Sequence, residues 1–277
     1  MRHIEGEFPG YQDLNLYYQC WLPSNKPRAI LLVAHGLAEH SGRYLNLVNH
    51  FVPQGYAVYS FDYQGHGRSP GLPGYIERFS YYINDLQAFG DMVRKKHSDT
   101  KFFLFGHSMG GTIAITYAIA HQAGLDGLLV SGATLQVGAS ISPVMILAAR
   151  ILSRLLPKAG LDVIDATAVS RDQDVVAAYV NDPLVYRGKI RARLGAEFIK
   201  AIQKLPPQMA KINLPILIMH GSADRLSEPS GSQILYQRVS SRDKTLKLYD
   251  GFYHEIFNEP GRQQVFADIE AWLDAHI

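Results

Sequence analysis

A serine at position 108 has a glycine two residues before it and another two residues after it, in the segment Gly106-His107-Ser108-Met109-Gly110. Glycines at these positions remove the side-chain atoms that would clash where a strand turns sharply into a helix, and they leave the serine hydroxyl exposed at the corner. A serine hydroxyl is a weak nucleophile, so it needs a base and a group that orients the base. The segment therefore predicts a nucleophile whose partners must lie elsewhere in the chain.

Two polar residues further along the chain have the positions that this chemistry requires. On a parallel sheet the partners of such a serine follow it in the order acid, then histidine, each just after a strand. Asp224 follows the apolar segment 214–221, and His254 follows the segment 244–251. The carboxyl ends of parallel strands meet at one edge of the sheet, where ligands bind. The sequence therefore predicts a catalytic triad of Ser108, Asp224 and His254.

Other residues compete for the roles of acid and base. Asp250 and Glu255 are alternative acids, but both lie almost beside His254 in the sequence, whereas Asp224 comes from a separate strand and can approach the imidazole from the far side. Among the eleven histidines, His220 is expected inside a strand in a packed, hydrogen-bonded role. His107 occupies the turn before the serine and is expected to line the substrate pocket.

A serine nucleophile that attacks a carbonyl group also needs backbone N–H groups that bind the oxyanion of the tetrahedral intermediate. One donor is expected at Met109, directly after the nucleophile, and the other at Leu37, in the loop after the apolar segment 29–34. The same loop contains His35, Glu39 and His40, but their spacing matches no zinc-binding pattern. We therefore expect neither a metal ion nor a cofactor.

Four motifs together resemble the monoacylglycerol lipase and lysophospholipase family of α/β-hydrolases, within the broader group of serine aminopeptidase S33-like hydrolases. They are His35-Gly36-Leu37-Ala38-Glu39-His40-Ser41-Gly42-Arg43-Tyr44, Asp62-Tyr63-Gln64-Gly65-His66-Gly67-Arg68-Ser69, the segment around Ser108 continued to Gly111, and Gly221-Ser222-Ala223-Asp224-Arg225-Leu226. They occur in the order typical of the family and span nearly the whole chain. In that family the residues at Ser108, Asp224 and His254 form the triad, and those at Leu37 and Met109 donate to the oxyanion.

The resemblance implies an enzyme that cleaves the carboxylic esters of lipids, with monoacylglycerols split into fatty acid and glycerol through an acyl-enzyme on Ser108. His107, Arg43 and Tyr179 then belong to the substrate-binding residues. Family members have a carboxylate four residues before the tyrosine that matches Tyr179, but this chain has Val175 there, with Asp174 adjacent. That departure leaves a broader carboxylesterase or a lysophospholipase open, and a serine peptidase as a further alternative.

The apolar segments alternate between strand-like and helix-like patterns over most of the chain, which predicts an α/β fold with a mostly parallel central sheet and helices on both faces. The alternation stops between Gly132 and about Asn213, where helical segments near 141–156, 171–180 and 191–204 are expected. We therefore predict a hydrolase core formed by residues 1–132 and 209–277, with residues 133–208 inserted as a helical cap. A cap of this kind excludes water and selects the substrate.

The first predicted cap helix, 141–156, carries an apolar stripe made of Val144, Leu147, Ala148, Ile151, Leu152 and Leu155. We expect most of this stripe to pack against the cap and the core. Met145, Ile146 and Leu156 widen the stripe beyond what packing needs, so they are candidates for a portal that touches lipid aggregates. Arg150, Arg154 and Lys158 would then lie near lipid headgroups.

Composition narrows the class of protein further. The 277 residues have a formal net charge of +2 and no long basic block, so nucleic acid is not an expected partner. The one cysteine, Cys20, excludes an internal disulfide, and it is expected to be a packed residue of a strand. With no apolar signal segment and no run of membrane-spanning length, the expected location is the cytoplasm, with peripheral membrane contact open. The oligomeric state is left open.

A non-catalytic binding protein remains the alternative from another functional class, because α/β-hydrolase folds also serve as receptors. Such a protein is expected to have lost one or more residues of the triad or of the oxyanion site. All five are present here, which favours an enzyme.

Overall fold

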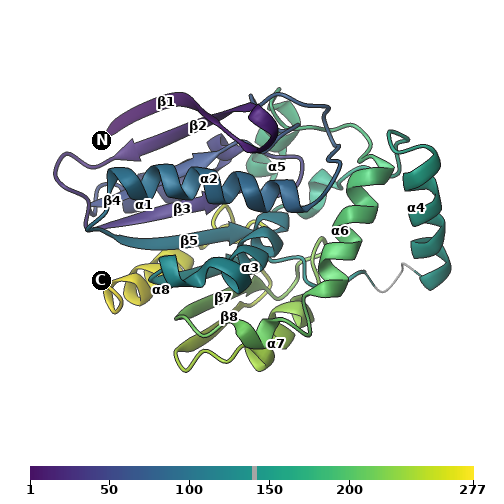
Figure 1. Ribbon diagram of the computed structural model, residues 1–277. Helices are drawn as coiled ribbons and strands as arrows, with labels where there is room; N and C mark the ends of the chain where they lie inside the picture. Colours follow the sequence, from purple (N-terminus) through teal and green to yellow (C-terminus); the bar gives the residue numbers. More distant parts are fainter. Residues whose placement is uncertain (139–141) are drawn as a thin grey trace.

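The structure is a computed structural model that describes residues 1–138 and 142–277. An eight-stranded sheet forms its centre, with the strand order β1-β2-β4-β3-β5-β6-β7-β8 (Figure 1). The strands are β1 Arg2–Pro9, β2 Asn15–Leu22, β3 Ala29–Ala34, β4 Tyr56–Phe61, β5 Lys101–His107, β6 Gly127–Ser131, β7 Ile216–Gly221 and β8 Lys244–Tyr249. β1 and β2 form an antiparallel hairpin, β2 joins β4 antiparallel, and β3 to β8 run parallel. The prediction of a mostly parallel α/β sheet is confirmed.

Helices cover both faces of this sheet. The α-helices are α1 Leu45–Phe51, α2 Ser80–Lys96, α3 Met109–His121, α4 Pro143–Leu155, α5 Gln173–Asn181, α6 Ala192–Lys204, α7 Pro229–Arg238 and α8 Gln263–Asp274. Side chains of α2, α3 and α7 join one hydrophobic cluster, and those of α1 and α8 join a second cluster. The sheet therefore separates two hydrophobic cores, as expected for helices on both faces.

The central strands show why this arrangement is stable. Every residue of β3 is buried, with Ile30 and Leu32 in the cluster of α2 and α3, and Leu31 and Val33 in the cluster of α1 and α8. Successive side chains of a strand point to opposite faces, so a strand that is covered on both sides must be apolar throughout. The edge strand β8 is only partly buried, and its residues alternate between Lys, Thr and Leu.

The helices α4, α5 and α6 follow β6 and precede β7 in the chain, in the segment that we predicted to be a cap. Figure 1 shows α4 at the end of the molecule, with α6 between it and the sheet. Among the described residues of 133–208, the one β-type pairing is the isolated bridge between Gly160 and Arg191. The helix expected over 141–156 is observed at Pro143–Leu155, where Ser142 caps its first turn by accepting a hydrogen bond from the backbone N–H of Met145. Its expected first residue, Ile141, lies outside the described residues.

The prediction that most of the apolar stripe of α4 is packed was wrong. Val144 is 75% exposed and Leu155 is 73% exposed, and Leu147 and Ile151 are also exposed. The physical reason is that α4 stands at the periphery of the molecule, where its main packing partner is the single helix α6. One neighbour cannot cover a stripe of this width, so α4 presents a hydrophobic surface to its surroundings.

Cys20 lies on β2 and is 3% exposed, in agreement with its predicted packed role. Burial raises the pKa of its thiol above the ordinary value. In the part of the chain that is described, none of the helices combines the length and the apolar character that crossing a bilayer requires.

Candidate active site

Ser108 stands on a sharp turn between β5 and α3. Its backbone has φ +55° and ψ −122°, a conformation that residues with a side chain rarely adopt. The flanking glycines make the turn feasible, because a Cβ atom on Gly106 would lie 2.5 Å from the carbonyl oxygen of Gly110, and one on Gly110 would overlap the carbonyl oxygen of Ala34. The turn therefore holds the hydroxyl at the carboxyl edge of the sheet.

The loops after β7 and β8 bring Asp224 and His254 together. Nδ1 of His254 donates a hydrogen bond of 2.7 Å to Oδ2 of Asp224. The other carboxylate oxygen accepts the backbone N–H groups of Leu226 at 2.8 Å and Ser227 at 3.0 Å. Burial works against the charge of Asp224, but His254 and hydrogen bonds from both His254 and His220 hold its pKa well below its usual range. The acid is therefore ionised and fixed in orientation.

His220 does more than the packed role that the sequence suggested. It is fully buried in β7, it contacts the hydroxyl of Ser232 at 2.7 Å, and its Nε2 lies 3.0 Å from Oδ2 of Asp224. The carboxylate thus has two imidazole neighbours. A spacing of four residues between His220 and Asp224, across the end of a strand, was the available sequence signal.

His254 has the electrostatic surroundings of a general base. Burial alone would lower the pKa of its imidazole, but Asp224, with smaller contributions from Glu255 and Glu39, raises it above the ordinary value. An imidazolium formed at this position is therefore stabilised by nearby carboxylates. His107, whose ring centre is 4.6 Å from that of His254, is kept neutral because burial and the His254 charge lower its pKa.

The loop after β3 approaches the nucleophile closely. A Cβ atom on Gly36 would lie 3.1 Å from Cβ of Ser108, which places the next peptide group, that of Leu37, beside the serine. Met109 begins α3, where backbone N–H groups have no partner within the helix. Among the residues that the structure describes, no protein acceptor takes the N–H of Leu37 or of Met109. Both donors are thus available to a developing oxyanion.

A cavity of about 150 Å³ opens beside these groups. Ser108, His254, Gly36 and Leu37 line it from the core. The wall from the predicted cap consists of mostly apolar side chains: Thr134, Ile164, Val169, Tyr179 and Phe198. Its chemistry is that of an ester-binding site, with a nucleophile at the base and an apolar lining.

The three predicted substrate-binding residues have different positions. His107 and Tyr179 line the cavity. Arg43 does not, and its guanidinium instead binds Glu255 and lies over the ring of Tyr179 at 4.7 Å. Sequence reasoning weighed Glu255 as a rival to Asp224, but it missed this pairing. The signal was the series of charged residues in the segment 35–44.

The polar residues of that segment have separate partners instead of converging on a metal ion. His35 accepts the backbone N–H of Tyr63, and His40 contacts Asp182 at 2.9 Å. Glu39 accepts the backbone N–H of Gly36. No group of three potential metal ligands occurs within residues 1–138 and 142–277.

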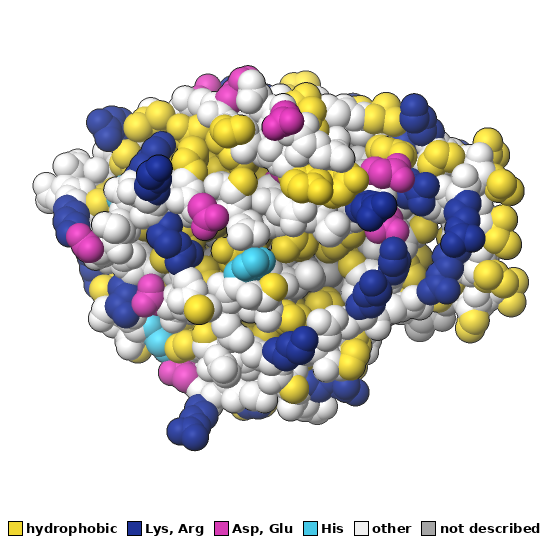
Figure 2. All heavy atoms as spheres, viewed as in Figure 1, with side chains coloured by type: hydrophobic (Ala, Val, Ile, Leu, Met, Phe, Trp, Pro, Cys, Tyr) yellow, Lys and Arg dark blue, Asp and Glu magenta, His cyan; other side chains and the backbone are white. Residues whose placement is uncertain are grey.

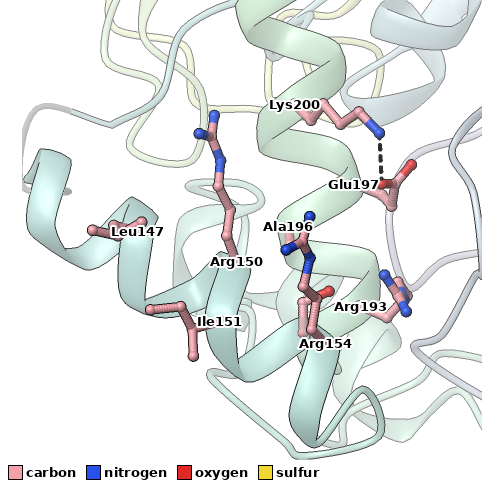
Figure 3. A pocket seen from close by; sticks show the side chains of 9 residues that line it. Leu147, Arg150, Ile151, Arg154, Arg193, Ala196, Glu197 and Lys200 are labelled. Carbon is pink, nitrogen blue, oxygen red and sulfur yellow. Dashed lines mark hydrogen bonds and ion pairs between the residues drawn. The ribbon is translucent and has the colours of Figure 1, made fainter.

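A larger groove of about 590 Å³ lies between α4 and α6, and none of the triad residues lines it (Figure 3). Figure 3 shows four cationic side chains along it: Arg150 and Arg154 from α4, with Arg193 and Lys200 from α6. Glu197 is the one acid among the lining residues, and it pairs with Lys200 at 3.1 Å. The groove is therefore mainly cationic, and its lining residues do not include a nucleophile paired with a base. We assign the reaction to the smaller cavity.

The chain is similar to known hydrolases over nearly its full length. Residues 25–261 match the family described as serine aminopeptidase, S33. A monoacylglycerol lipase of Mycolicibacterium smegmatis is 36% identical, covering 99% of this chain and 98% of its own, and a phospholipase of Bacillus subtilis is 31% identical, covering 92% and 98%. The crystal structure of a monoacylglycerol lipase from Paleococcus ferrophilus has a TM-score of 0.84 and 32% identity, covering 95% of this chain and 99% of that one.

Proposed function

Because the chain belongs to the serine aminopeptidase S33 family of α/β-hydrolases, we propose that it is a lipase that cleaves monoacylglycerols into fatty acid and glycerol. The observation that carries the proposal is the meeting of Ser108, His254 and the loop residue Leu37 at one mostly apolar cavity. Relatives named as monoacylglycerol lipases support the substrate class.

The proposed reaction proceeds through an acyl-enzyme. His254 accepts the proton of the Ser108 hydroxyl while the oxygen attacks the ester carbonyl, and Asp224 stabilises the imidazolium that forms. The N–H groups of Leu37 and Met109 bind the tetrahedral oxyanion. His254 then gives its proton to the departing alcohol. A water molecule deprotonated by the same histidine releases the fatty acid from Ser108.

The acyl chain has an apolar path toward the cap. The cavity of about 150 Å³ is smaller than the pockets of roughly 300–1,000 Å³ that hold drug-sized ligands. A long chain must therefore extend past Ile164 and Phe198, into the segment 133–208 that we infer to be a cap. Each methylene that leaves water there contributes about 0.8 kcal/mol, so chain length is expected to control KM.

Recognition of the alcohol leaving group is expected to differ from that of relatives with a carboxylate before the cap tyrosine. Val175 is half-buried and cannot accept a hydrogen bond from glycerol, and Asp174 is exposed on α5. Glu39 and Glu255 are the acidic residues among those that line the cavity. A broader carboxylesterase or a lysophospholipase is therefore the second candidate, and the 31% identity to a phospholipase is consistent with it.

We also infer that the protein contacts lipid aggregates through α4. Figure 2 shows apolar side chains gathered at the end of the molecule where α4 lies, with Lys and Arg side chains beside them. Val144, Leu147, Ile151 and Leu155 are more than half exposed. An apolar stripe beside cations suits the boundary between acyl chains and headgroups, which is consistent with transient, peripheral binding.

Hydrolysis of monoacylglycerols with acyl chains of increasing length, compared with lysophospholipids and simple aryl esters, tests the proposal. Ser108→Ala is expected to reduce turnover by at least about a thousandfold, while Ser230→Ala, an exposed serine, retains it. An organophosphonate is expected to label Ser108. Turnover that survives in Ser108→Ala contradicts the mechanism. Cleavage of short aryl esters alone contradicts the lipase substrate but not the mechanism.

A further inference from the structure

Three charged residues form a buried cluster next to the proposed active site. Glu39 lies in the loop after β3, Arg43 in the short 3₁₀ turn Ser41–Tyr44, and Glu255 directly after His254. Nη2 of Arg43 donates to both carboxylate oxygens of Glu255, at 2.9 and 2.8 Å, and Nε lies 3.4 Å from Oε2 of Glu39. The exposed fractions of these side chains are only 4% for Glu39, 7% for Arg43 and 3% for Glu255.

Stability does not explain such a cluster. Removing three charges from water costs more than one guanidinium and two carboxylates recover unless every group is well paired. Here two acids share one cation, and Oε2 of Glu39 and Nε of Arg43 have no hydrogen bond among the described residues. Burial, followed by the charge of Glu255, raises the pKa of Glu39. The cluster is therefore an expensive arrangement, which suggests that it serves the site beside it.

Glu39 fixes the loop that carries the first oxyanion donor. Its Oε1 accepts the backbone N–H of Gly36 and, at 2.7 Å, the hydroxyl of Tyr44. The peptide group that follows Gly36 is the one whose N–H belongs to Leu37. Ala38, two residues on from Gly36, has φ +65°, a strained conformation that needs support from its surroundings. The Glu39 carboxylate supplies that support from inside the loop.

Glu255 fixes the loop that carries the base. Its backbone N–H donates to the carbonyl of Val169 at 2.8 Å, and its Oε2 accepts the side-chain N–H of Asn258 at 2.7 Å. With Arg43 bound to the same carboxylate, the residue next to His254 is held at both its backbone and its side chain. The His254 backbone has little freedom left.

We propose that Arg43 is a positioning residue: it bridges Glu39 and Glu255 and so holds the oxyanion loop and the histidine loop at a fixed distance around Ser108. This role rests on the proposed serine mechanism, and it takes the place of direct substrate binding for Arg43. A guanidinium suits the role, since its planar group places Nη2 on Glu255 and Nε beside Glu39 at the same time. A lysine would keep the charge without the geometry.

The cluster also acts on the charge of the base. The titratable groups that face His254 are Asp224 from the loop after β7, Glu255 from its own loop, Glu39 from the loop after β3, and His107 from the elbow, with His220 behind Asp224. The charge of Glu255 is one of the contributions that raise the pKa of His254. Glu255→Gln removes that charge while keeping the shape and one acceptor oxygen. The imidazolium is then less stabilised, and the acid limb of the pH–rate profile moves to lower pH.

The experiment compares Arg43→Met, Arg43→Lys and Glu255→Gln on a soluble butyrate ester, with Arg187→Met, an exposed cap arginine, as the matched control. For Arg43→Met we expect kcat to fall about a hundredfold, comparable to the loss of one oxyanion donor, with KM changed less than twofold. Arg43→Lys is expected to recover part of kcat. Arg187→Met is expected to match the parent protein.

Each outcome decides the proposal. A raised KM with unchanged kcat in Arg43→Met would mean that the arginine binds substrate instead. Unchanged kcat in Arg43→Met, or an unmoved pH profile in Glu255→Gln, overturns the positioning role. If Arg43→Met does not fold, as judged by circular dichroism, the isosteric Glu255→Gln decides alone. Ser108→Ala is measured alongside to separate the two proposals. Full turnover in Ser108→Ala contradicts the serine mechanism itself. If Ser108→Ala loses turnover but the Arg43 variants keep the kcat of the parent protein, only the positioning role of Arg43 is contradicted.

Discussion

The carboxyl edge of the sheet and helix α4 are built in opposite ways. Around Ser108 the polar groups are buried and hydrogen-bonded from several elements, so that Asp224 alone has four partners. On α4 the large side chains are apolar and exposed, and one helix provides most of the packing. The sheet edge holds its polar groups in place before the substrate binds, whereas α4 leaves its apolar side chains in contact with solvent.

This contrast separates two tasks of a lipid hydrolase. Chemistry on an ester needs donors and a base held within fractions of an ångström, which only a rigid, water-poor site provides. Finding an ester inside a lipid aggregate needs a surface that gains from contact with apolar chains. A substitution at the sheet edge is therefore expected to affect the hydrolysis of all substrates, and a substitution on α4 only that of aggregated substrates.

The largest effect is expected at the sheet edge from Asp224→Asn. An asparagine cannot supply the charge that stabilises the His254 imidazolium, and its amide donates where the carboxylate accepted. By comparison with other serine hydrolases, kcat is expected to fall about 10⁴-fold on soluble and aggregated esters alike. Steady-state kinetics on both substrate forms measure it. Asp250→Asn, the exposed rival acid, is the control, and an equal loss there would reverse the assignment of the acid.

An effect of intermediate size is expected on α4. The double variant Leu147→Gln, Ile151→Gln removes two exposed apolar side chains, and several methylenes at about 0.8 kcal/mol each amount to about tenfold or more in binding to a lipid surface. Hydrolysis of monoacylglycerol in vesicles and co-sedimentation with the vesicles should both decline. Rates on soluble butyrate esters should not change. The control Leu248→Gln, which replaces a partly exposed leucine of β8, should leave both rates unchanged. If the α4 double variant lost activity equally on soluble and aggregated esters, α4 would not act in lipid binding alone.

The smallest effect on kcat is expected at a buried acid of the core that does not line the active-site cavity. Asp85 on α2 is 2% exposed, its Oδ1 accepts the backbone N–H of Tyr11 at 2.6 Å, and burial raises its pKa to about 7, partly offset by that hydrogen bond. Between the unfolded pKa of 3.8 and about 7, the folded protein binds more protons than the unfolded chain, so this group makes stability fall as pH rises.

Asp85→Asn keeps an acceptor for Tyr11 and removes the titration. Relative to the parent protein, the variant should gain stability by about 4 kcal/mol between pH 4 and pH 8, because the pKa of Asp85 is raised from 3.8 to about 7, with no change in kcat. Urea unfolding at the two pH values measures the difference. A constant difference would show that Asp85 does not titrate in this range, and a loss of activity would show that the core and the site are coupled.

Much of this arrangement was predictable from the sequence, because it depends on local rules. A strand that is buried on both faces must be apolar, so β3, β5 and β7 could be located from their composition, and the residues after them then fell at one sheet edge. The sharp turn at Ser108 was predictable from Gly106 and Gly110, because the turn leaves no room for a side chain at either position. The chain order of Ser108, Asp224 and His254 completed the prediction of the site.

What escaped prediction depends on contacts between distant segments. The pairing of Arg43 with Glu255 joins residues 212 positions apart, and no local pattern specifies it. The exposure of α4 was misjudged for a related reason: periodicity shows which face of a helix is apolar, but not whether a second element covers that face. Helix α6 is the main neighbour of α4 and leaves most of that face exposed.

The burial of Cys20 in β2 has a practical consequence for following helix α4. A thiol that is 3% exposed, with a pKa raised by burial, reacts slowly with maleimides at neutral pH, and it is the one cysteine of the chain. The parent protein is therefore expected to take up little maleimide dye. A cysteine introduced at Val144 would accept a fluorophore alone, and its emission would report when the tip of α4 leaves water for lipid.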